Sequence, residues 1–85
     1  DHSVWDGFMK RNYREPVIVK TLDLEYKGWL SANSNREERK EIVLDQPAIV
    51  YTYDDGTKQD FPCGRQILLF GEDIKSITVL EETEK

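Results

Sequence analysis

The feature that most constrains the fold of this chain is a set of short β-rich segments, each bent or joined at a glycine. Residues 17–22 are followed, after a brief turn, by residues 25–30, which carry Gly28. Near the end of the chain, residues 69–77 have the pattern of two short strands joined at Gly71. Strands that curl tightly need glycines or bulges where the backbone bends. The pattern predicts a small antiparallel barrel of strongly bent strands.

A short helix is predicted before the first strand. Ser3 is a suitable N-cap. Asp6 stands at the third helical position, from which its carboxylate can accept a hydrogen bond from the backbone amide of Ser3. Apolar residues then recur at helical spacing, at Val4, Trp5, Phe8 and Met9. Pro16 ends the helix, because a residue before proline avoids the helical region.

The middle of the chain predicts a hairpin of long strands. Residues 40–53 are β-rich but interrupted by Pro47, which indicates an edge or a bulge. The Asp55-Gly56 pair is typical of a tight hairpin turn. Three further segments complete the prediction: a loop or frayed strand extension at 33–39, a fourth strand at 58–70 with a bulge at 62–64, and a fifth strand at 74–80.

Length and charge limit the classes of protein that this chain can represent. Eighty-five residues predict one domain, with a helical part at 1–15, the barrel at 16–80 and an acidic tail at 81–85. A core this small favours association with further copies. A net charge of −5 argues against nonspecific coating of nucleic acid. We expect no membrane span, and a single cysteine, Cys63, favours the reducing cytoplasm.

Catalytic and metal-binding patterns are weak in this sequence. The only nucleophile–base pair would join Cys63 to the single histidine, His2, across a long reach. Turn chemistry accounts for Asp54 and Asp55. Histidine and cysteine are too few for a zinc site, and no glycine-rich phosphate loop is present. We therefore expect no enzyme activity, no cofactor and no metal.

Two motifs of the chain resemble those of the Sm-like proteins, the group of the Sm, LSm and bacterial Hfq proteins. The first motif of that family is an apolar strand, a turn and a Gly-x-Leu strand, matched here by Val17, Val19, Gly28 and Leu30. The second has the form Ile-Arg-Gly-x-x-Ile-x-x-Ile, over which lie Leu69, Phe70, Gly71, Ile74 and Ile77. A short helix followed by five strands also agrees with the family's order of elements.

The resemblance implies a closed homo-oligomeric ring, of five to seven copies, in which strand four of one subunit pairs with strand five of the next. It also implies binding of single-stranded, often U-rich, RNA around the pore. The family's Asp, Met and Asn of the loop after strand two would fall on Ser34, Glu37 and Glu38, and its basic residue before the second-motif glycine is Phe70 here. The resemblance therefore implies an altered uridine site.

Within that resemblance, five residues are the expected RNA contacts: Asn33, Asn35, Arg36, Phe70 and Gly71. The asparagines would read a base edge, Phe70 would stack on a base, and Arg36 would meet a phosphate. The backbone at Gly71 would permit close approach. The alternative hypothesis is the same small barrel as a non-catalytic structural or protein-interaction module without RNA binding, which the acidic charge and the missing basic residue favour.

Overall fold

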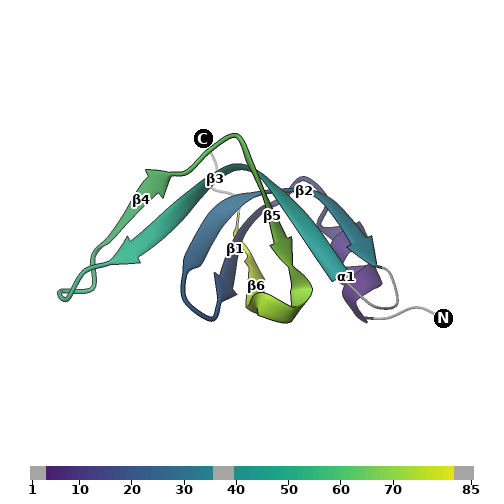
Figure 1. Ribbon diagram of the computed structural model, residues 1–85, viewed down its shortest axis with the longest axis horizontal. Coiled ribbons are helices and arrows are strands. Elements are labelled where there is room, and N and C mark those ends of the chain that lie inside the picture. Colours follow the sequence, from purple (N-terminus) through teal and green to yellow (C-terminus); the bar gives the residue numbers. More distant parts are fainter. Residues whose placement is uncertain (1–3, 36–39, 82–85) are drawn as a thin grey trace.

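The fold is mainly β, as expected, with a short helix before a strongly bent antiparallel sheet (Figure 1). The computed structural model describes residues 4–35 and 40–81. Its elements are, in order, α1 (Val4–Arg11), β1 (Pro16–Thr21), β2 (Glu25–Asn35), β3 (Lys40–Thr52), β4 (Lys58–Pro62), β5 (Gln66–Phe70), the 3-10 helix η1 (Gly71–Asp73) and β6 (Ile74–Val79).

Strand β3 organises the sheet because three other strands pair with it. The strands follow the order β4-β3-β2-β1-β6, and β5 also pairs with β3. The second half of β3 pairs with β4 and its first half pairs with β5. In Figure 1 the β3–β4 hairpin extends to one side of the molecule and α1 lies toward the other.

The single fourth strand expected at 58–70 is divided into β4 and β5. Both segments still pair with β3, and the break falls at the expected bulge. Gly64 has a φ of 138°, a conformation that favours glycine, and Gln46 on β3 has a φ of 51°. Hydrogen bonds from the Gln46 amide to the Arg65 carbonyl (2.8 Å) and from the Cys63 amide to the Pro47 carbonyl (3.0 Å) bridge the corner. The bend is therefore shared by two neighbouring strands.

The barrel expected from the sequence is not closed within one chain. Among the described strands, β5 pairs with β3 and β6 pairs with β1, but β5 and β6 do not pair with each other. A two-residue hairpin would have placed these consecutive strands side by side. The chain instead passes through η1, which leads it from one edge of the sheet to the other.

The core lies on the inner face of this bent sheet, where alternate strand residues point inward. Its buried side chains are Met9, Val17, Val19, Leu30, Ile42, Leu44 and Leu69. Helix α1 contributes Met9 to this core, and Trp5 and Phe8 pack against it. The side chain of Trp29 is 48% exposed, because its neighbours Gly28 and Leu30 take the inward positions of β2.

Strand β2 is longer than its expected end at residue 32. It continues to Asn35, so Asn33 and Asn35 belong to a strand extension rather than to a loop. Residues 36–39 lie outside the described residues. Within residues 4–35 and 40–81, no helix is long and apolar enough to cross a membrane.

Candidate RNA-binding edge

The backbone register brings the expected RNA contacts toward one end of the sheet. Asn33 of β2 pairs with Ile42 of β3, which pairs in turn with Leu69 of β5. In the next row, Ser34 pairs with Glu41, which pairs with Phe70. Adjacent strands lie about 4.8 Å apart, so the end of β2 and the end of β5 are roughly 10 Å apart. We call this region, formed by residues 33–35, 40–42 and 69–71, the pore edge, after the pore that the resemblance to Sm-like proteins implies.

Gly71 sits against the first residue of β3. A Cβ atom at this position would come within 2.9 Å of the Lys40 Cβ and 3.0 Å of the Lys40 carbonyl oxygen. These are atoms at or next to the backbone, so they cannot swing aside as the tip of a side chain can. Glycine is therefore needed here for packing alone, because it lets the start of η1 lie directly on β3.

Phe70 and Glu41 occupy the outer side of the sheet at the pore edge. Their neighbours Leu69 and Ile42 are buried in the core, and successive strand residues point to opposite faces. Both Phe70 and Glu41 are partly buried. An aromatic ring at this position can offer a face for stacking, but it supplies no positive charge.

The described charges in the pore edge and in the two residues that follow it are mostly negative. Among the described residues of this region, Lys40 is the one with a positive charge, and it is partly buried. Glu41 stands beside it in β3, and Glu72 and Asp73 follow in η1. Since phosphate contacts dominate the affinity of most nucleic-acid sites, this balance weakens attraction for an RNA backbone.

The structure thus places four of the five expected RNA contacts at the pore edge. Asn33 and Asn35 lie in β2, Phe70 ends β5, and Gly71 begins η1. Arg36 lies outside the described residues, as does His2. The contact between Lys40 and Gly71 was not predicted from the sequence. No local signal pointed to it, because the contact joins segments thirty-one positions apart.

Two free strand edges flank the sheet. Within the described part of the chain, β4 and β5 have no partner strand on the side away from β3, and β6 has none on the side away from β1. Unpaired backbone N–H and C=O groups on such edges favour the addition of another strand. An edge on each side of the same chain makes head-to-tail association geometrically available.

The β3–β4 hairpin is held by its turn and by ion pairs. The Asp55 carboxylate accepts hydrogen bonds from the Thr57 amide (3.0 Å) and the Thr57 hydroxyl (2.7 Å). The backbone bond, and then the hydroxyl bond, stabilise the charged carboxylate and lower the pKa of Asp55 below its ordinary value of 3.8. Gly56 has the expected positive φ, at 91°, but Asp55 does not, so the turn is not the two-residue type in which both central residues are left-handed. A hydrogen bond from the Gly56 amide to the Tyr53 carbonyl (2.9 Å) closes it.

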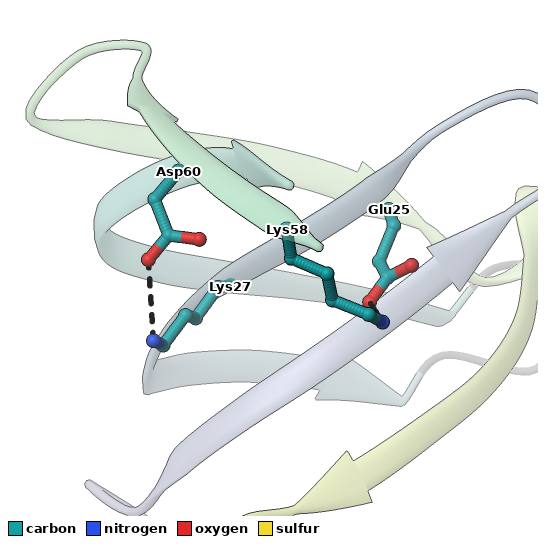
Figure 2. Close-up of polar contacts among 4 residues, drawn as sticks. All are labelled: Glu25, Lys27, Lys58 and Asp60. Atoms are coloured by element: carbon teal, nitrogen blue, oxygen red, sulfur yellow. Dashed lines mark hydrogen bonds and ion pairs between the residues drawn. The ribbon is translucent and has the colours of Figure 1, made fainter. Parts of the chain in front are cut away.

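Two ion pairs join β4 to β2 across the intervening β3 (Figure 2). Lys27 Nζ lies 3.2 Å from Asp60 Oδ2, and Lys58 Nζ lies 3.6 Å from Glu25 Oε2. The pairs lie on the outer face, where they cover Val50, 9% exposed. They orient the hairpin relative to β2, although each exposed pair contributes little to stability.

No protein-family model and no curated protein sequence matches this chain. Solved structures do. The SmAP1 heptamer of P. aerophilum matches with a TM-score of 0.71 at 16% sequence identity, covering 96% of this chain and 100% of that one. A heptameric archaeal Sm protein matches with a TM-score of 0.64 at 17% identity, covering 88% of this chain and 98% of that one.

These matches span nearly the whole chain, so the molecule has the Sm fold. The fold implied by the two motifs is confirmed, including the short helix before the strands. With 16% and 17% sequence identity, the similarity to these two proteins is one of backbone fold.

Proposed function

We propose that this chain is an Sm-like protein that assembles into a closed homo-oligomeric ring and binds single-stranded RNA at the pore edge through an altered uridine site. The observation that carries the proposal is the pair of free edges, at β5 and β6, in a chain whose fold matches that of two heptameric proteins. Pairing β5 of one copy with β6 of the next would give hydrogen-bond partners to the unpaired backbone N–H and C=O groups of both edges. Ring closure then prevents open-ended growth.

The size of the particle tests the ring. We propose five to seven copies, with seven being the number in both similar structures. A ring of seven would have a mass of about 70 kDa, compared with 10.0 kDa for one chain. Light scattering across a range of protein concentrations measures this mass. A particle of one chain at all concentrations would remove the ring from the proposal.

The RNA role is supported by the position of Phe70 and Gly71 at the same end of the sheet as the end of β2, with β3 between them. In this proposal Phe70 stacks on a base, Asn33 and Asn35 read its edge, and Arg36 meets the phosphate. The scarcity of cations among the described residues of the pore edge predicts weak binding that changes little with salt, because the salt dependence grows with the number of phosphates that cations neutralise.

Titration with oligo-U and oligo-A at moderate salt tests the RNA role. Stacking of one base on an aromatic side chain is worth about 1–3 kcal/mol, so Phe70→Leu should weaken binding by roughly 5- to 150-fold. Leucine keeps an apolar side chain at this partly buried position and removes only the ring. Phe61→Leu is the matched control, because Phe61 is 45% exposed on β4, outside the pore edge. The absence of saturable binding to either oligonucleotide would remove the RNA role.

A second candidate function is a ring or small β module that binds proteins and not RNA. The carboxylates Glu41, Glu72 and Asp73 favour it, since they oppose phosphate binding. The ultraviolet absorbance ratio of the purified particle separates the two candidates. An absorbance ratio typical of protein without nucleic acid, together with no oligonucleotide binding, would favour this second function.

The proposal assigns the chain no catalytic activity and a cytoplasmic location. The lowered pKa of Asp55 is explained by its turn hydrogen bonds, which need no reaction to account for them. The thiol of Cys63 is exposed at the corner between β4 and β5, as a reducing compartment allows. Turnover that depended on Cys63 would contradict the non-catalytic assignment.

A further inference from the structure

An exposed apolar surface lies outside the pore edge, where the β1–β2 turn meets the last residues of β3 and the start of β6. A hollow of about 620 Å³ opens there. Three of its lining side chains are unusually exposed for their type: Leu22 at 71%, Leu24 at 43% and Tyr51 at 53%. Apolar side chains that gather on a surface commonly mark an interaction site. We call this region, lined also by Lys20 and Lys75, the turn hollow.

Contacts on both sides hold the apolar walls of the turn hollow in place. On one side, the Thr21 amide donates to the Leu24 carbonyl at 2.8 Å. The Leu24 amide in turn donates to the Thr21 hydroxyl at 3.1 Å, which fixes the turn that presents Leu22. On the other side, the ring of Tyr51 meets that of Tyr53 edge-on, with centroids 4.8 Å apart. A preorganised surface loses little conformational entropy when a partner binds.

The rim of the turn hollow carries two lysines that form no ion pair within the described part of the chain. Lys20 and Lys75 are exposed, and neither has an ion-pair partner among residues 4–35 and 40–81. Glu25, which also lines the hollow, is engaged by Lys58 at 3.6 Å. Asp23 is the remaining carboxylate of the lining. The two lysines therefore favour a ligand that brings carboxylates next to apolar groups.

We propose that the turn hollow binds a segment of a partner protein in which apolar residues alternate with, or adjoin, acidic ones. Leu22, Leu24 and Tyr51 would bury the apolar side chains, and Lys20 and Lys75 would pair with the carboxylates. A small molecule fits poorly, because such ligands are usually enclosed over most of their surface and this hollow is open. RNA fits poorly too, since leucines offer no hydrogen bonds to bases.

Selection from phage-displayed random twelve-residue peptides on the intact protein tests this proposal. We expect enrichment of peptides that combine Leu, Ile or Phe with Asp or Glu. The affinity of a selected synthetic peptide, measured by fluorescence polarisation, should fall at least tenfold in Leu22→Ser and in Lys75→Glu. Two control substitutions on α1, Val4→Ser and Lys10→Glu, change an exposed apolar and an exposed basic residue of another element. They should leave the affinity unchanged.

Several outcomes overturn the proposal. Failure to enrich any such peptide would do so, as would peptide binding that survives both Leu22→Ser and Lys75→Glu. Loss of oligo-U or oligo-A binding in these variants would assign the turn hollow to RNA. A fall in particle mass in Leu22→Ser would assign it to another copy of this chain. Light scattering and circular dichroism on each variant keep these results separate from the ring proposal and from misfolding.

Discussion

Replacing Gly71 with alanine is expected to destabilise the fold, although the substitution adds only one methyl group. The new Cβ would stand 2.9 Å from the Lys40 Cβ and 3.0 Å from the Lys40 carbonyl oxygen. Ordinary contacts between such atoms begin at about 3.5 Å. The start of η1 and the start of β3 must therefore separate by several tenths of an ångström.

The size of the effect follows from where this strain falls. Overpacking of a well-packed contact typically costs about 1–3 kcal/mol. Both ends of the Gly71 contact belong to the sheet or to the chain directly after it, so relief requires a shift of β3 or of β5. For a domain with a total stability of about 5–10 kcal/mol, a loss of this size is easily measured.

Urea unfolding, followed by circular dichroism, measures the change in Gly71→Ala. Wild type and variant must be compared at one protein concentration, because assembly into oligomers adds to apparent stability. Gly7→Ala is the matched control. Its Cβ would meet only the Arg11 Nη1 atom, at 3.2 Å, at the end of a flexible side chain. Alanine is also favoured over glycine inside a helix by roughly 0.5–1 kcal/mol, so this control should be neutral or stabilising.

Equal stability of Gly71→Ala and wild type would refute the packing argument. If stability were unchanged but oligonucleotide binding fell, the glycine would serve the RNA site and not the sheet. If both glycine variants lost the same free energy, the loss would not be specific to the contact with Lys40.

Three further predictions follow from the described contacts. Leu44→Ala, at a fully buried position, should cost about 2–5 kcal/mol in the same unfolding assay, because it leaves a cavity in the core. A double-mutant cycle on Lys27 and Asp60, whose side chains are 46% and 44% exposed, should give a coupling below about 1 kcal/mol that weakens with salt; a larger value would mean that the pair is not screened by solvent. An NMR titration of Asp55 should give a pKa below 3.8. Because the folded pKa is lowered, its contribution to stability is present above the unfolded pKa and is lost as the pH falls through the folded pKa; Thr57→Ala should move the pKa back toward its ordinary value.

Local chemistry was enough to predict the turns and the overall class of fold. Asp55-Gly56 predicts the tight turn that the structure contains, and the Pro62-Cys63-Gly64 run predicts the corner between β4 and β5. These features depend on φ preferences and missing amide donors, which each residue carries with it. For residues 33–35 the sequence left a loop and a strand extension open, since they have no apolar pattern; pairing with β3 decides for the strand extension.

The candidate site was predicted only as a set of positions. Phe70 and Gly71 were named through their motif, and the structure places them at the pore edge with Asn33 and Asn35. The contact of Gly71 with Lys40 and the pairing of Phe70 with Glu41 could not be predicted from the sequence. It depends on register between strands that are distant in sequence, and register is set by which residues share the core.

By itself, the sequence determined a short helix, a succession of curled strands and the residues at which they bend. Whether the sheet would close was decided only by tertiary structure. The hydrogen bonds of β5 are satisfied by β3 on one side, and those of β6 are satisfied by β1. Closing the sheet within one chain would require β5 and β6 to pair, but η1 carries the chain across from one to the other. The two free edges, and with them the capacity to join other copies, result from that long-range arrangement.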